Sequence, residues 1–294
     1  MISNTLGPCS FSEALDAMEA VAAAGLDTVW VPQNYGIESL TLIAAAGSRV
    51  PDIELGTAVV PTFSRHPLTL ASQALTAQAA CGGRLTLGIG PSHQRATEGF
   101  MGIPYHRPAR HTREYLTVLQ AFLDTGGVEF SGELITANTL NGPHPVADAA
   151  PIPVLVSALA PAMLRLTGEL ADGTITWMAT AGVLGDRIVP SINAAAGAAG
   201  RPDPRVIAGL PVCITSDPGG ARQRAADLFG IYSTRPAYRR LLDEAGVKGP
   251  EDVALVGDEE EVARSLAALA DAGVTDLMAA PFGTETLARL NTLR

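Results

Sequence analysis

The stretch that decides the fold is IPVLVSALAPAMLRLTGELADGTITWM, residues 152–178. Residues 152–156 form an apolar, largely β-branched run without alternation, which is typical of a strand buried on both faces of a parallel sheet. Pro161 stands where a helix would start, because its fixed φ suits the helix and its missing N–H costs nothing there. Asp172 and Gly173 then turn the chain into a second strand at residues 174–178. The stretch therefore predicts a complete strand–helix–strand unit.

The turn inside this unit is suited to an anionic ligand. Backbone N–H groups at a helix N-terminus lack intrahelical acceptors, and the helix dipole favours negative charge beside them. We therefore expect Ser157, Ala158 and the N–H groups from Leu159 to Met163 to contact a phosphate. Trp177 ends the following strand, where α/β folds bind ligands, so we expect it to line the same cavity or to pack just beneath it.

The same alternation of strands and helices continues along the whole chain. Strands are predicted at residues 2–6, 26–31, 53–60, 84–89, 152–156, 174–178, 206–214 and 275–280, each followed by a helical segment. Such alternation implies parallel strands joined by right-handed crossovers. No GxGxxG follows the first strand, so an α/β fold closed into a (β/α)₈ TIM barrel is favoured over an open Rossmann sheet.

We expect one domain over residues 1–294, with an insertion at residues 126–150 that forms a hairpin near Ser131 and Gly132. The predicted first strand is short and polar, as it would be if a few residues were missing before Met1.

Composition limits the partners. The formal net charge of −10 argues against nucleic-acid binding, which needs a basic surface. No run of 18 or more apolar residues and no basic-then-apolar N-terminus occur, so we expect a cytoplasmic protein without a membrane partner. The three cysteines, Cys9, Cys81 and Cys213, have no metal-ligand spacing, so neither a disulfide scaffold nor a metal site is expected. The remaining partner class is a small molecule.

Four segments, in this order, resemble the bacterial luciferase-like monooxygenase superfamily, and within it the coenzyme F420-dependent oxidoreductases. They are DTVWVP (27–32), LGTAVVPTFSRHPLTL (55–70), GRLTLGIG (83–90) and GELADGTITW (168–177). The resemblance implies a TIM barrel with a deazaflavin at the carboxyl ends of its strands, hydride transfer at the deazaflavin C5, and a homodimer.

The resemblance also assigns residues to the cofactor. A non-proline cis peptide that supports the deazaflavin ring falls at Ala58–Val59, and Gly90 ends the fourth strand beside it. Ser64 and His66 are placed at the mouth of the barrel. The alternative for this segment is a plain helix N-terminus with Ser64 as its cap and Arg65 paired to a surface carboxylate.

Catalysis is expected from His93, just beyond the fourth strand, because a histidine there can bind a carbonyl oxygen or donate a proton near neutral pH. The alternative is a solvated loop histidine. Many relatives carry an acidic residue followed by histidine after the second strand, whereas this chain has Gln33 and Asn34, which do not titrate. The proton would then come from His93, Tyr105 or water.

The leading functional hypothesis is an F420-dependent oxidoreductase that transfers a hydride between deazaflavin C5 and a small organic substrate. Two alternatives share the cofactor site: an FMN-dependent luciferase-like monooxygenase, and a non-catalytic flavin or deazaflavin carrier, which the Gln33–Asn34 pair favours. A metal-dependent hydrolase or isomerase is disfavoured, because only five histidines occur and no HxH or carboxylate cluster ends a strand.

Overall fold

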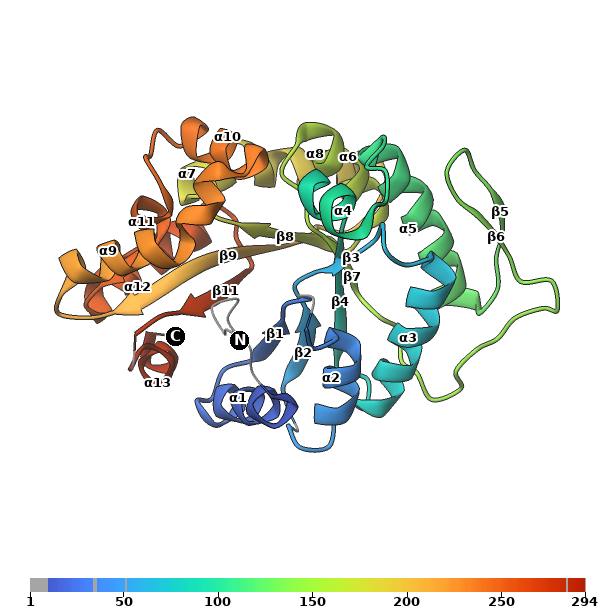
Figure 1. Ribbon diagram of the computed structural model, residues 1–294, viewed down its shortest axis with the longest axis horizontal. Helices are drawn as coiled ribbons and strands as arrows, with labels where there is room; N and C mark the ends of the chain where they lie inside the picture. Colours follow the sequence, from blue (N-terminus) through green and yellow to red (C-terminus); the bar gives the residue numbers. More distant parts are fainter. Residues whose placement is uncertain (1–9, 34–35, 51, 284, 294) are drawn as a thin grey trace.

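A parallel sheet curls into a nearly closed barrel with helices around its outside (Figure 1). The computed structural model describes residues 10–33, 36–50, 52–283 and 285–293. The barrel strands are β1 (Thr28–Val31), β2 (Glu54–Thr57), β3 (Val60–Pro61), β4 (Leu85–Gly90), β7 (Val154–Val156), β8 (Gly173–Trp177), β9 (Arg205–Ile214), β10 (Leu255–Gly257) and β11 (Asp276–Pro281).

The strand order β1-β2-β4-β7-β8-β9-β10, with β3 also on β4 and β11 on β9, confirms the predicted TIM-barrel fold. Two details differ from prediction. The predicted strand 53–60 is divided into β2 and β3, and β10 was not predicted at all. The predicted strand 2–6 lies outside the described residues.

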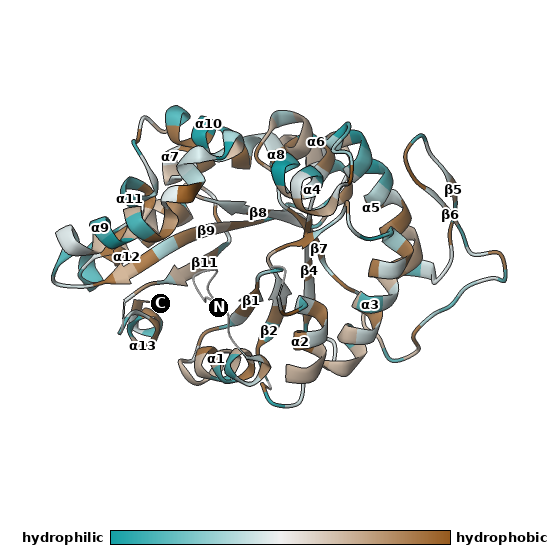
Figure 2. Ribbon diagram, in the orientation of Figure 1, coloured by the Kyte–Doolittle hydropathy of each residue, from teal (hydrophilic) through white to brown (hydrophobic). Residues whose placement is uncertain are grey.

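Helices alternate with the strands as the sequence predicts. They are α1 (Phe11–Ala23), α2 (Ser39–Ala46), α3 (Pro67–Ala80), α4 (Gln94–Met101), α5 (Pro108–Thr125), α6 (Pro161–Leu170), α7 (Ala181–Val183), η1 (Leu184–Ile188), α8 (Val189–Ala198), α9 (Pro218–Phe229), η2 (Gly230–Thr234), α10 (Pro236–Glu244), α11 (Pro250–Val253), α12 (Glu259–Asp271), α13 (Thr286–Leu290) and η3 (Asn291–Leu293). No helix in the described ranges is both long and apolar enough to cross a membrane. In Figure 2, β9 is mostly hydrophobic, whereas α9 and α10 carry hydrophilic residues.

Local sequence signals explain where several helices begin. Ser10 and Glu13 exchange side-chain and backbone hydrogen bonds in a capping box at the start of α1. Pro161 opens α6 and Pro67 opens α3, both at the first helical turn. The cap of α3 is His66 rather than Ser64, because Nδ1 of His66 accepts the N–H of Leu68 at 3.3 Å.

Large apolar side chains fill the barrel interior beneath its carboxyl end. Trp30, Leu155, Ile175, Ile207 and Met278 form one buried cluster there. Gly56 permits this packing, since a Cβ at that position would lie 2.3 Å from the Trp30 ring. Burial of each such side chain contributes about 1.5–3 kcal/mol. The interior is therefore a packed core, and any ligand must bind above it.

The opposite end of the barrel is closed by a polar cluster. Arg205 on β9 pairs with Glu54 on β2 at 2.8 Å and with Asp276 on β11 at 2.7 Å. Burial alone would raise the pKa of Glu54, but its hydrogen bonds to Arg205 and Thr86 outweigh burial and lower it. The cluster thus ties strands from both sides of the barrel.

The predicted insertion contains the expected hairpin, β5 (Glu129–Ser131) with β6 (Thr136–Asn138). Its turn is held by Glu114 of α5, whose carboxylate accepts the N–H groups of Glu133, Leu134 and Ile135 at 2.8–3.2 Å. The Glu114 side chain is only 5% exposed. This single acidic residue therefore anchors the insertion to the barrel.

Candidate active site

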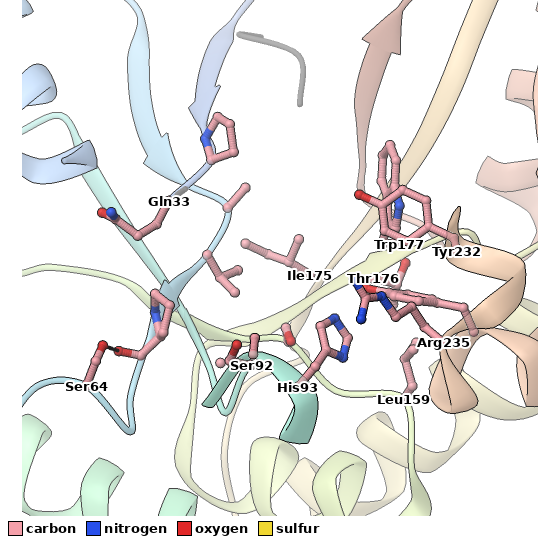
Figure 3. Close-up of a pocket in the computed structure, with 18 of the residues that line it drawn as sticks. Gln33, Ser64, Ser92, His93, Leu159, Ile175, Thr176, Trp177, Tyr232 and Arg235 are labelled. Carbon is pink, nitrogen blue, oxygen red and sulfur yellow. Dashed lines mark hydrogen bonds between the residues drawn. The ribbon is translucent and has the colours of Figure 1, made fainter. Parts of the chain in front are cut away.

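A cavity of about 620 Å³ opens at the carboxyl ends of the strands (Figure 3). One side is formed by residues that follow β1 and β2, including Gln33 and Val59. The opposite side is formed by Trp177 at the end of β8 and by the segment of η2 and α10. Catalytic and binding residues of TIM barrels lie at this end, so this pocket is the candidate active site.

Most residues that the sequence singles out do line this pocket. They are Ala58, Val59, Ser64, Gly90, His93, Ser157, Leu159 and Trp177. The peptide bond between Ala58 and Val59 is cis, as the family resemblance implied.

Three of the predicted residues are placed elsewhere. His66 caps α3, and its Nε2 lies 3.1 Å from the carbonyl oxygen of Thr136 in the hairpin. Ala158 is 1% exposed and Met163 is 8% exposed, and both side chains pack in the main core. None of the three is among the described residues that line the pocket. If Ala158 or Met163 contacts a ligand there, only its backbone is suited to do so.

The floor of the pocket between β3, β4 and β7 is made of small groups. A Cβ at Gly90 would lie 2.8 Å from Oγ of Ser157 and 3.0 Å from Cγ2 of Val59. The absence of a side chain at position 90 therefore lets Ser157 and Val59 approach the backbone of β4, and all three residues line the pocket. We call Gly90, Val59 and Ser157 the glycine cradle.

The N-terminus of α6 lies beside this cradle. Its N-cap is Ala160, which has extended backbone dihedral angles and offers no side-chain cap, and Pro161 follows. No side chain therefore competes for the first N–H groups of the helix. The arrangement matches the anion-ready turn predicted from the sequence.

His93 is the N-cap residue of α4, but its side chain makes no capping bond. Its ring stands edge-on to Tyr238 of α10, with centroids 5.6 Å apart. Burial and then the positive charge of Arg235 lower the pKa of His93 below its ordinary value. Both effects favour the neutral imidazole, in which one ring nitrogen donates and the other accepts a hydrogen bond.

Two other polar residues that the sequence singles out, Gln33 and Tyr105, are engaged in hydrogen bonds within the fold. The amide oxygen of Gln33 accepts from both the N–H and the hydroxyl of Ser39, so Gln33 lines the pocket while it holds the start of α2. Tyr105 donates its hydroxyl to the carbonyl oxygen of Ser92 at 3.3 Å, and burial raises its pKa. Asn34 lies outside the described residues.

Trp177 is held by an aromatic cluster. Its ring meets Tyr232 edge-on at 5.6 Å and Phe229 at 6.2 Å. Its Nε1 is buried and has no hydrogen-bond partner within the described part of the chain. Trp177 therefore both lines the pocket and packs against the wall behind it.

Comparison with known proteins identifies the family. A family model described as luciferase-like monooxygenase matches residues 3–276. The chain belongs to the luciferase-like monooxygenase family.

Among luciferase-like proteins, one relative from Mycobacterium tuberculosis is 27% identical over an alignment of 307 positions. The alignment covers 87% of this chain and 88% of the relative. Its name assigns it provisionally to the coenzyme F420-dependent oxidoreductases. Two solved structures share the fold: an F420-dependent secondary alcohol dehydrogenase in complex with an F420-acetone adduct, and the FMN-bound oxygenating component of 3,6-diketocamphane monooxygenase from Pseudomonas putida. The first is 16% identical with a TM-score of 0.80, covering 97% of this chain and 96% of that one. The second is 19% identical with a TM-score of 0.73, covering 94% and 88%.

The pocket of this luciferase-like protein offers a hydroxyl and free backbone N–H groups to a ligand. The glycine cradle presents an uncluttered surface and a hydroxyl, and the uncapped α6 presents backbone N–H groups for an anion. By contrast, no group of three or more His, Cys, Asp and Glu suited to a metal ion occurs among the described residues. The residues present therefore fit an organic, phosphate-bearing cofactor.

Sequence reasoning missed the wall of this luciferase-like pocket formed by η2 and α10. The sequence predicts helices between residues 218 and 246, where the structure has α9, η2 and α10, but it gives no sign that this segment reaches the pocket. Ile231, Tyr232, Arg235 and Tyr238 from this segment all line the pocket. Gly230 and the first-turn proline Pro236 signal only the breaks between these helices, because both residues mark helix boundaries.

Backbone conformation at two strand ends is a second feature that the sequence does not show. Ser92, just after β4, has φ of 62°, and Met178, just after β8, has the same φ. Non-glycine residues seldom adopt this left-handed conformation, and they concentrate at functional sites. Both positions adjoin pocket-lining residues, so the backbone there is fixed by its surroundings.

Proposed function

We propose that this luciferase-like protein is an F420-dependent oxidoreductase that acts on a small organic substrate. The observation that carries the proposal is the glycine cradle beside the uncapped N-terminus of α6. The F420-related name of the mycobacterial relative supports the choice of deazaflavin. Reduced F420 supplies a hydride from its C5 when bound.

The chain's own residues have separable roles in this proposal. Gly90 and Val59 back the ring system, and Ser157 together with the first N–H groups of α6 binds the phosphate. His93 forms a hydrogen bond with the oxygen of the substrate. It gives a proton to that oxygen when the substrate is reduced and takes a proton from it when the substrate is oxidised. The aromatic wall of Trp177 and Tyr232 excludes water from the reacting side.

The cofactor assignment is tested by titrating the purified protein with F420 and, separately, with FMN, following fluorescence quenching. We expect F420 to bind at least about tenfold more tightly than FMN, a difference of about 1.4 kcal/mol. Tight FMN binding with no response to F420 would instead support the monooxygenase alternative.

Gly90→Ala, with Gly99→Ala as its matched control, tests the site. A Cβ at Gly90 meets Ser157 and Val59, whereas one at Gly99 on α4 has nothing within 4 Å. We expect Gly90→Ala to weaken F420 binding at least about tenfold while Gly99→Ala leaves it unchanged. Equal affinities of the two variants would move the cofactor away from the cradle.

His93→Ala and His93→Gln test the catalytic role. Both variants should bind F420 normally, and both should lose about 10²- to 10⁴-fold in turnover, the usual contribution of general acid–base catalysis. Gln keeps a hydrogen-bond donor but cannot titrate, so it should also remove the histidine limb of the pH–rate profile. An unchanged rate and pH profile would exclude His93 as the proton donor. If bound F420 gave no turnover with any substrate, the carrier alternative would take precedence.

A further inference from the structure

We propose that the substrate carries a carboxylate next to an apolar body, and that Arg235 is the residue that recognises this carboxylate. The inference rests on the proposed function, since it assigns the substrate side of the same pocket. Its basis is the charge balance of the pocket, the place of Arg235 beside His93 (Figure 3), and the exposed apolar residues that line the pocket.

The charges that line the pocket leave one cation without a counter-ion. Glu38 and Arg65 form an ion pair at 3.0 Å, so their charges offset each other. Arg235 also lines the pocket, and no carboxylate pairs with it within residues 10–33, 36–50, 52–283 and 285–293. The sequence outside these ranges contains no Asp or Glu side chain. A partly buried guanidinium in a protein of net charge −10 is thus available for an anionic ligand.

Arg235 lies on the side of the pocket that is formed by Trp177, η2 and α10 (Figure 3). Figure 3 shows it beside His93 and Thr176, with Gln33 and Ser64 across the cavity. The effect of Arg235 on the pKa of His93 also requires the two side chains to be close. A carboxylate on Arg235 would therefore hold the rest of a substrate next to His93, the proposed proton donor.

The rim of the pocket is apolar on the same side. Ile231 of η2 is 53% exposed and Phe100 of α4 is 68% exposed, and both line the pocket together with Leu159. Large apolar residues exposed at a pocket mouth mark a surface that is covered when a ligand binds. An organic anion with an apolar body would satisfy Arg235 and cover these side chains at once.

Arginine suits a carboxylate better than lysine does. Its planar guanidinium makes two parallel hydrogen bonds to a carboxylate, which fixes the orientation of the ligand as well as its charge. Replacement by lysine should therefore retain part of the affinity but lose orientation.

The proposal is tested by calorimetric titration with 3-phenylpropanoate and with its neutral isostere 3-phenylpropanamide, with and without bound F420. The proteins compared are the wild type, Arg235→Gln, Arg235→Lys and the control Arg240→Gln, which removes an exposed arginine from the same helix. We expect the wild type to prefer the carboxylate at least tenfold. Arg235→Gln should weaken carboxylate binding by about 10- to 100-fold, the value of a lost charge-assisted pair. The carboxylate affinity of Arg235→Lys should fall between those of the wild type and Arg235→Gln, and the carboxylate affinity of Arg240→Gln should equal that of the wild type.

A second titration, with F420 and with the tail-less deazaflavin riboside, separates the two possible sources of the anion. If Arg235 serves the substrate, Arg235→Gln binds both deazaflavins as the wild type does. If Arg235→Gln weakens F420 but not the riboside, Arg235 binds the anionic tail of the cofactor and the substrate proposal is overturned. Equal binding of acid and amide by the wild type also overturns it. Failure of wild-type F420 binding would instead refute the proposed function, because the carboxylate preference is also measured without the cofactor.

Discussion

Replacing Thr57 with valine should destabilise the fold more than its size suggests. Thr57 is the last residue of β2, and the next strand to pair with β4 is β3, which starts at Val60. Between the pairing of β4 with β2 and its pairing with β3, the Thr57 hydroxyl takes the place of a backbone partner for Gly88 of β4. It donates to the carbonyl oxygen of Gly88 at 2.8 Å and accepts the N–H of Gly88 at 2.9 Å. Both residues are buried, and Thr57 is 0% exposed.

The magnitude follows from these two bonds. Valine has nearly the shape of threonine, so Thr57→Val removes the hydroxyl and leaves the N–H and the carbonyl of Gly88 without that partner in a dry environment. An unsatisfied buried group costs about 1–3 kcal/mol, and a carbonyl with a second lone pair is at the low end. We therefore expect a loss of about 2–4 kcal/mol in the free energy of unfolding. Thr57→Ser keeps both bonds and removes one methyl group, so it should lose only about 1 kcal/mol.

The assay is urea unfolding monitored by circular dichroism. The midpoint concentrations of urea are compared between variants that have the same m-value, the slope of the unfolding free energy against urea concentration. Thr117→Val is the matched control, because its exposed hydroxyl on α5 bonds only the carbonyl of Arg113 at 3.0 Å. That variant should stay within about 0.5 kcal/mol of the wild type. If Thr57→Val were no less stable than Thr57→Ser, the hydroxyl would not be replacing the missing ladder bonds and the reasoning would be refuted.

Three further predictions concern charges. Glu114→Gln should lower stability by about 2–3 kcal/mol. It should also remove part of the acid sensitivity of the wild type, because hydrogen bonds that outweigh burial lower the pKa of Glu114, and its stabilisation is present above the unfolded pKa and lost as pH falls. Arg205→Met should lower the free energy of unfolding by about 2 kcal/mol, a value reduced for solvent screening because the side chains of the cluster are about one-third exposed. The loss should be larger at pH 7 than at pH 4, since the charge of Glu54 is then left without its partner. Urea unfolding at both pH values checks this, and an equal loss would count against it. Arg235→Gln should raise the pKa of His93, measured by NMR titration, because only burial would then lower it; no change would mean that the two side chains are not neighbours.

The barrel could be predicted from the sequence because its strands are buried on both faces and read as continuous apolar runs. The segment β7 is such a run, β4 and β8 are buried strands that also hold threonines, and all three begin within two residues of the predicted position. The strand β10 could not be predicted, since its three residues, LVG, are too few to show a pattern. Its pairing with the last residues of β9 depends on tertiary contacts alone.

The candidate site divides in the same way. Gly90, Ser157 and Trp177 were predicted to lie together because the carboxyl ends of parallel strands meet at one edge of a sheet. Met163 is the third residue of α6 and its side chain is buried in the core, so the prediction that it contacts a ligand concerns its backbone N–H alone. Arg235 lies some twenty residues beyond the end of β9, and only the packing of the segment 230–244 brings it to the pocket.

The wall that carries Arg235 is joined to the loop before α6 by an arginine that is not among the described residues lining the pocket. Arg187 of η1 donates to the carbonyl oxygen of Leu159 at 2.7 Å, in the loop just before α6, and makes a two-pronged pair with Glu244 at the end of α10 at 2.5 and 2.8 Å. Swinging α10 away would break this charge-assisted pair as well as the contact of Tyr238 with His93. The proposed carboxylate receptor is therefore held in place before any ligand arrives. Affinity then depends little on ordering the wall, and substitutions at Arg235 report on recognition rather than on closure.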